Sequence, residues 1–146
     1  MSEQPVIIEC AINGVGRKER NPHIPRSPEE VKTDSLACLD AGAAIIHAHN
    51  SSIRLVGQEA VDDYVAAWRD LLDERPDTLW YPTGVVAAST EDRILHHELL
   101  ADLGLIRMAY VDPGSTNTGW ADDDGLPVGG TYVNTYEHIR AAFEQC

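Results

Sequence analysis

The sequence has few cysteines, few basic residues and no long hydrophobic run. Its three cysteines, Cys10, Cys38 and Cys146, form no CxxC pair, which fits a reducing compartment and predicts a cytoplasmic location. Lysine and arginine number 11 against 24 aspartates and glutamates, a formal net charge of −13. Such a field repels phosphate backbones and anionic lipids, so we expect no nucleic-acid or membrane binding. No stretch approaches the roughly 20 apolar residues of a membrane span.

What the chain does contain is an alternation of short apolar runs and amphipathic segments. The hydrophobic pattern predicts strands over residues 6–12, 43–49, 78–83 and 105–111. It predicts helices over residues 27–42, 60–74, 90–103 and from residue 134 onward, with a long loop over 112–133. This alternation predicts an α/β fold with a parallel sheet, either doubly wound or part of a barrel. No linker divides the chain, so residues 1–146 are expected to form a single domain.

Two histidines stand at the end of the second predicted strand, in the run Ile-Ile-His-Ala-His-Asn. Strand alternation places His47 and His49 on the same face, and in a barrel active sites lie at the carboxyl ends of strands. Two converging imidazoles favour a zinc site, although they can also be hydrogen-bonded core residues. Zinc needs at least one further ligand. His23, in the first loop, is a weak candidate, and His96 and His97, in mid-helix, are expected to be exposed or to snorkel towards solvent.

Polar residues follow the other predicted strands. Asn13 follows the first strand, Thr83 ends the third, and Ser115 and Asn117 follow the fourth. Each alone is explained by ordinary turn chemistry, but their shared position at strand ends favours a binding site on one rim. The first loop also holds a basic cluster, which is either solvated or a landing place for a phosphate-bearing cosubstrate. Its members are Arg17, Lys18, Arg20 and Arg26.

Taken in order, these motifs resemble the β-keto acid cleavage enzymes, typified by 3-keto-5-aminohexanoate cleavage enzyme, over essentially the whole chain. The matching segments are Ala11-Ile12-Asn13-Gly14, Asn21-Pro22-His23-Ile24-Pro25, residues 41–49 through His47-Ala48-His49, Thr83-Gly84, Met108-Ala109, Gly114-Ser115-Thr116-Asn117 and Val133-Asn134. The resemblance implies a zinc-dependent TIM (β/α)8 barrel, of which this chain is the N-terminal half with about four βα units.

The resemblance also implies an activity. Such enzymes condense a β-keto acid with acetyl-CoA and give acetoacetate and a new CoA thioester, with the two histidines, His47 and His49, holding Zn²⁺. The third ligand (a glutamate), the acid–base aspartate and an active-site arginine belong to the second half of the barrel. This half alone is therefore expected to be inactive, and to associate with a complementary half or with itself.

The chain departs from the aminohexanoate enzymes at positions that bear on the substrate. Gly16, Pro82 and Tyr110 stand where those enzymes carry a carboxylate and hydroxyls for the substrate amino group. These differences argue against an amino-substituted substrate. Because Tyr110 stands at such a substrate-binding position, we expect it to bind substrate together with Asn13 and Thr83. Two alternatives stay open: a metal-dependent hydrolase of the amidohydrolase type, and a non-catalytic half-barrel binding module. In the amidohydrolases His-x-His ends the first strand, whereas here a whole βα unit precedes it.

Overall fold

The computed structural model describes residues 4–146 and divides after Ala109 into two compact units. The first unit contains β1 (Glu9–Ala11), α1 (Pro28–Asp40), β2 (Ile45–Ala48), α2 (Gln58–Glu74), β3 (Leu79–Pro82) and α3 (Thr90–Asp102). The second contains β4 (Thr116–Ala121), β5 (Pro127–Tyr132) and α4 (Tyr136–Gln145). The expectation of one domain over residues 1–146 stays a prediction.

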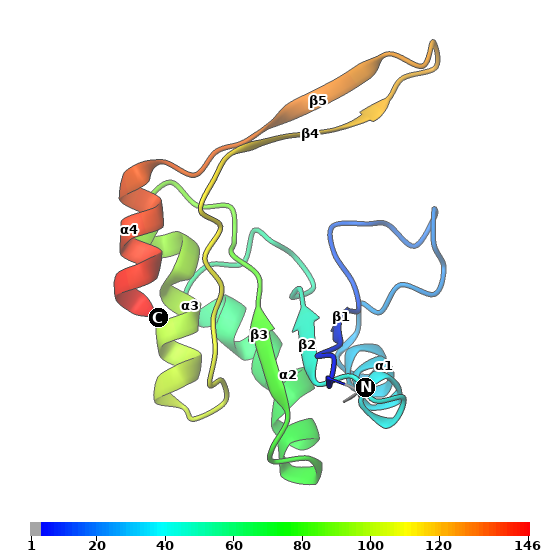
Figure 1. The fold of residues 1–146 in the computed structure, drawn as a ribbon, viewed down its shortest axis with the longest axis vertical. Coiled ribbons are helices and arrows are strands. Elements are labelled where there is room, and N and C mark those ends of the chain that lie inside the picture. Colours follow the sequence, from blue (N-terminus) through cyan, green and yellow to red (C-terminus); the bar gives the residue numbers. More distant parts are fainter. Residues whose placement is uncertain (1–3) are drawn as a thin grey trace. The chain divides into compact units, whose positions relative to one another are not determined.

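The first unit is built on a three-stranded parallel sheet in which β2 lies between β1 and β3 (Figure 1). Ile46 on β2 is buried and aligned with the buried Trp80 on β3. The next residue along β2, His47, points to the opposite face and is only half-buried. The alternation of a strand therefore separates a covered face from a more open one. The predicted α/β class with a parallel sheet is confirmed.

Helices α1, α2 and α3 supply the cover for one face of this sheet. The core joins Val31 of α1, Leu71 of α2 and Leu100 of α3 to the strands, and Trp68 stacks on Trp80 with ring centroids 3.9 Å apart. Aromatic pairs add favourable contact energy beyond the area that they bury. No helix within residues 4–146 is long and apolar enough to cross a membrane.

Helix α1 begins as its sequence predicts. The Ser27 hydroxyl accepts a hydrogen bond from the Glu30 backbone N–H at 3.2 Å, and the Glu30 carboxylate accepts one from the Ser27 N–H at 3.1 Å. This is the reciprocal capping box, with Pro28 at the first helical position. Gly42, at φ +101°, follows the helix in the left-handed region that favours glycine.

The fourth predicted strand, over residues 105–111, is wrong. That segment has no strand pairing, and β3 is hydrogen-bonded only to β2 within the described residues. Its apolar character still serves the core, because Ile106 is buried. The Leu105 carbonyl accepts from the Trp80 indole N–H at 2.7 Å, a side-chain bond in place of a backbone ladder. A hydrophobic run predicts burial more securely than it predicts strand pairing.

The long loop predicted over residues 112–133 is also wrong, because most of it forms the antiparallel hairpin β4–β5 (Figure 1). The sequence signal is Asp124-Gly125, a strong hairpin turn dipeptide. Asp122 accepts hydrogen bonds from two backbone N–H groups of this turn, and Gly125 has φ +78°. At the other end of the hairpin, the Ser115 hydroxyl accepts from the Asn134 N–H at 2.9 Å.

His96 and His97 contradict the expectation of exposure, because their exposed fractions are 0% and 3%. Both lie on the buried side of α3, and both Nε2 atoms contact the Thr83 carbonyl oxygen, at 2.7 Å and 3.4 Å. A carbonyl oxygen only accepts, so both Nε2 atoms donate. Mid-helix histidines were expected outside because a charged imidazole is costly to bury, but a neutral one with a partner is not.

The neutral state of these histidines predicts a pH-dependent stability. Burial foremost, and then the repulsion that a protonated His96 would exert, lower the pKa of His97 from 6.5 to about 3. The unfolded chain takes up a proton below pH 6.5 and the folded chain does not, so stability falls as the pH decreases from 6.5 towards 3. Between pH 8 and pH 5 His97 accounts for about 2 kcal/mol of this loss. Urea denaturation should show that His97→Gln loses less stability over this interval than the wild type. An equal loss in both would contradict a buried neutral His97.

Candidate metal centre

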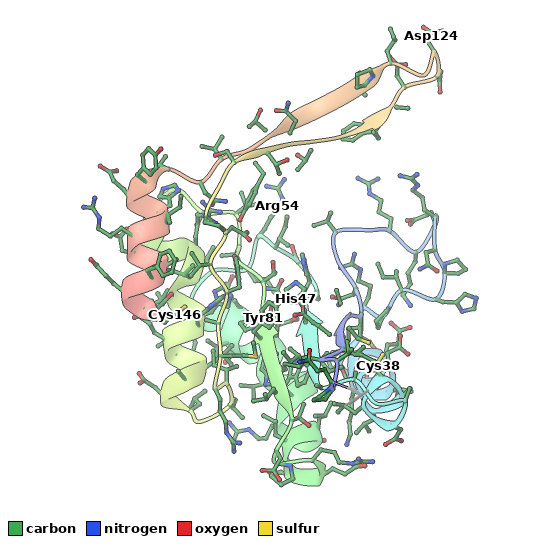
Figure 2. The ribbon with its side chains drawn as sticks, viewed as in Figure 1. Cys38, His47, Arg54, Tyr81, Asp124 and Cys146 are labelled. Atoms are coloured by element: carbon green, nitrogen blue, oxygen red, sulfur yellow. The ribbon has the colours of Figure 1, made fainter. Side chains whose placement is uncertain are left out.

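The open face of the sheet carries His47 at the carboxyl end of β2, beside Tyr81 of β3 (Figure 2). The two rings stack with centroids 4.5 Å apart at 26°. His47 Nδ1 contacts the Tyr81 carbonyl oxygen at 3.2 Å, so this nitrogen carries the proton. The Tyr81 hydroxyl in turn donates to Glu9 of β1 at 2.6 Å. The orientation of the His47 ring is thus set by the neighbouring strand.

His49 lies two residues further on, and its ring meets that of His47 edge to face, with centroids 5.1 Å apart at 74°. Zinc bonded at about 2.1 Å to one nitrogen of each of two imidazoles, at a tetrahedral angle, places the ring centroids about 5 Å apart. Burial, first, then His47 and then Arg26 lower the pKa of His49 to about 4. The imidazole is therefore neutral at pH 7, the form that a metal requires. The two residues fit a shared metal ion.

The backbone N–H and carbonyl groups of His49 are both held by the side chain of Asn13. Asn13, after β1, accepts from the His49 N–H at 2.6 Å through Oδ1 and donates to the His49 carbonyl at 3.0 Å through Nδ2. Its Nδ2 also donates to the Pro25 carbonyl at 3.3 Å. The Asn13 amide, predicted to bind substrate, is thus engaged with the backbone of the second histidine. Its substrate role stays a prediction.

Tyr64 of α2 holds the neighbouring peptides through one buried hydroxyl. That hydroxyl accepts from the backbone N–H groups of Asn50 and Thr83, each at 3.1 Å, and donates to the Ala48 carbonyl at 3.2 Å. A phenolic hydroxyl has one proton and accepts at two positions, so these three bonds match its capacity. Tyr64 thereby ties the end of β2, with its histidines, to the end of β3.

The remaining predicted substrate-binding residues lie in different places. Thr83 is in the first unit, where its backbone bonds Tyr64 and both buried histidines of α3. Tyr110, Ser115 and Asn117 belong to the second unit. There Ser115 closes the base of the hairpin, and Asn117 Oδ1 accepts from the Thr131 hydroxyl at 3.1 Å. Of the predicted residues, Asn13 therefore contacts the backbone of His49 directly. Thr83 is linked to the residue after His49 through the Tyr64 hydroxyl, which both backbones bond.

Two members of the basic cluster in the first loop are engaged with the protein itself. Lys18 pairs with the Glu30 carboxylate, and together with the Arg26 and Ser27 backbone N–H groups it lowers the pKa of Glu30 to about 2. Arg26 donates to the Gly16 carbonyl. The exposed Arg17 and Arg20 are the members that stay available to a phosphate-bearing partner.

Among residues 4–146 no group of three or more histidines, cysteines, aspartates or glutamates is placed to hold a metal ion. Within the described residues, the candidate site of the first unit therefore consists of two imidazoles, those of His47 and His49. Three side chains that surround His47 and His49 were not predicted from the sequence: Tyr64, Tyr81 and Asn50. Only Tyr64 had a usable signal, since it stands with Val61 and Trp68 on the apolar face of an amphipathic helix, where a hydroxyl needs a partner.

Comparison with known sequences identifies the family. A family model described as beta-keto acid cleavage enzyme matches residues 5–146. The chain belongs to the β-keto acid cleavage enzyme family. It is similar to a 3-keto-5-aminohexanoate cleavage enzyme of Acetoanaerobium sticklandii, with 28% identity over 119 residues. That match covers 80% of this chain and 42% of the relative, so the matched segment spans less than half the length of this family member.

The Tyr64 hydroxyl gives a test of this arrangement. Tyr64→Phe leaves two backbone N–H groups and one carbonyl without their partner, and should lower the free energy of unfolding by about 3 kcal/mol. Amide hydrogen exchange should also accelerate at Asn50 and Thr83. The matched control is Tyr132→Phe, whose hydroxyl bonds the exposed Asp112 at 2.9 Å and should change stability by about 0.5 kcal/mol or less. Equal effects of the two substitutions would argue against a stabilising role of the three hydrogen bonds made by the Tyr64 hydroxyl.

Proposed function

We propose that this chain provides the metal-binding N-terminal half of a zinc-dependent β-keto acid cleavage enzyme with a TIM (β/α)8 barrel. The single observation that carries the proposal is the contact of the His47 and His49 rings, with centroids 5.1 Å apart, at the carboxyl end of a parallel strand. Family membership supports the reaction type, and the strand–helix order of the first unit is compatible with successive βα units of a barrel.

His47 and His49 would hold the zinc ion, each through Nε2. When bound, zinc supplies a Lewis acid that polarises the carbonyl of a β-keto acid. The protein residues around it act by orientation: Tyr81 fixes the His47 ring, and Asn13 and Tyr64 fix the His49 backbone. Such outer contacts are typical of metal sites, where they set the ring orientation and the tautomer of the ligand.

The substrates follow from the family and from the charge of the chain. With a net charge of −13, an anionic β-keto acid and acetyl-CoA need a local positive centre. The metal would supply it for the keto acid, and the exposed arginines of the first loop, Arg17 and Arg20, for the phosphates of CoA. Asn13, Thr83, Tyr110, Ser115 and Asn117 remain the proposed substrate-binding residues. Gly16 and Pro82 favour a β-keto acid without an amino group.

The partner would be a complementary half-barrel or a second copy of the chain. The outer edges of β1 and β3 pair with no strand in the described part of the chain. Just before β1, Val6, Ile7 and Ile8 have exposed fractions of 82%, 74% and 51%. Open edges and exposed apolar side chains favour association. A partner segment would also supply the third zinc ligand, which by the family resemblance is a glutamate.

The metal proposal is tested by elemental analysis of protein purified without chelator. We expect near-stoichiometric zinc in the wild type and its loss in the His47→Ala/His49→Ala double variant, because both imidazole ligands are removed. His23→Ala, which changes an exposed histidine of the first loop, should retain the metal. A wild type without zinc would contradict a metal site in this chain alone, and would favour the non-catalytic half-barrel.

Association is tested by light scattering at micromolar concentration. We expect a dimer or a larger species for the wild type, because association buries the apolar residues that precede β1. Ile7→Lys places a charge among them and should shift the distribution towards the monomer. A monodisperse wild-type monomer would argue strongly against this partner.

A further inference from the structure

A small cavity adjoins His49. Asn50 and Trp68 are among the residues that line it, and its volume is about 10 Å³. A water molecule needs roughly 10–15 Å³ measured in this way, so the cavity has the size for one water.

The polar atoms around this cavity distinguish it from a packing defect. Asn50 and Trp68 have exposed fractions of 3% and 0%. Asn50 Nδ2, Asn50 Oδ1, Trp68 Nε1 and His49 Nδ1 are buried without a hydrogen-bond partner among the described residues. They are four of the six such side-chain atoms in that part of the chain, and all four belong to residues that line this one cavity. Apolar cavities stay dry, whereas a cavity with several polar partners holds water.

We propose that one buried water occupies this cavity and positions the ring of His49. The water accepts hydrogen bonds from His49 Nδ1 and Trp68 Nε1, and it donates one to Asn50 Oδ1. A water molecule has two protons and accepts two bonds, so it can make these three contacts together. Asn50 and Trp68 are then positioning residues, which act on the metal site through the water and through His49.

This arrangement determines the tautomer of His49. With the Nδ1 proton directed to the water, the lone pair lies on Nε2. His47 has the same tautomer, because its Nδ1 donates to the Tyr81 carbonyl at 3.2 Å. Both rings thus offer the same nitrogen, one oriented by a backbone carbonyl and the other by a buried water. The metal role of the water rests on the proposed zinc site, but the tautomer and the water do not.

The first experiment is ¹⁵N NMR of the metal-free chain at neutral pH, with cross-relaxation between water and the Trp68 indole N–H. We expect the Nδ1–H tautomer at His49 and a long-lived water at Trp68. The second experiment is titration with Co²⁺ of the wild type and of three variants. Asn50→Leu and Trp68→Phe remove polar groups from the cavity and should weaken Co²⁺ binding by about 10- to 100-fold.

Trp80→Phe is the matched control. Trp80 belongs to the same stacked pair as Trp68 and also donates its indole N–H, but to the Leu105 carbonyl. It does not line the cavity, so its substitution should leave Co²⁺ affinity and the His49 tautomer unchanged while removing a comparable core volume. Circular dichroism establishes that each variant is folded. Should Trp68→Phe fail to fold, Asn50→Leu provides the same comparison.

The outcomes separate the two proposals. A wild type that does not bind Co²⁺ contradicts a metal site in this chain alone, and with it the metal role of Asn50 and Trp68 there, whatever the tautomer. A wild type that binds Co²⁺ but carries the His49 proton on Nε2 overturns the water-mediated positioning alone. Wild-type affinity in folded Asn50→Leu would overturn it as well.

Discussion

The candidate site depends on one hydroxyl group. Tyr64 reaches from α2 to the carboxyl ends of β2 and β3 and satisfies three backbone groups there. Short strands end abruptly, and the peptide groups beyond them would otherwise lie buried without partners. Because one atom makes all three bonds, the ends of the two strands keep a fixed separation. His47, His49 and Thr83 lie on the segments fixed in this way, so the geometry of the candidate site depends on a helix residue outside it.

Much of the first unit could be predicted from sequence, because its signals are local. The start of α1 is encoded in Ser27, Pro28 and Glu30, whose interactions span only a few residues. Likewise, the face shared by His47 and His49 follows from strand alternation alone. The family resemblance was carried by short motifs in a fixed order, and the match over residues 5–146 confirms it. Local patterns suffice where neighbours along the chain decide the structure.

What the sequence did not predict depends on partners distant along the chain. Residues 105–111 have the composition of a strand, but pairing needs a neighbouring edge, and the Leu105 carbonyl bonds a tryptophan instead. His96 and His97 are buried because they contact the Thr83 carbonyl, 13 and 14 residues earlier. Asn13 contacts His49 across 36 residues. The hairpin is a different kind of error, since its turn signal at Asp124-Gly125 was present and local.

The hydrogen bonds that hold the backbone at position 49 do not depend on its side chain. Asn13 holds the N–H and the carbonyl of this residue, and Tyr64 holds the peptides on either side, so none of these bonds involves the imidazole. A different side chain at position 49 could therefore occupy the same backbone without loss of the strand end. The same feature makes position 49 suitable for protein engineering, because other metal-binding side chains can be substituted there on an unchanged backbone.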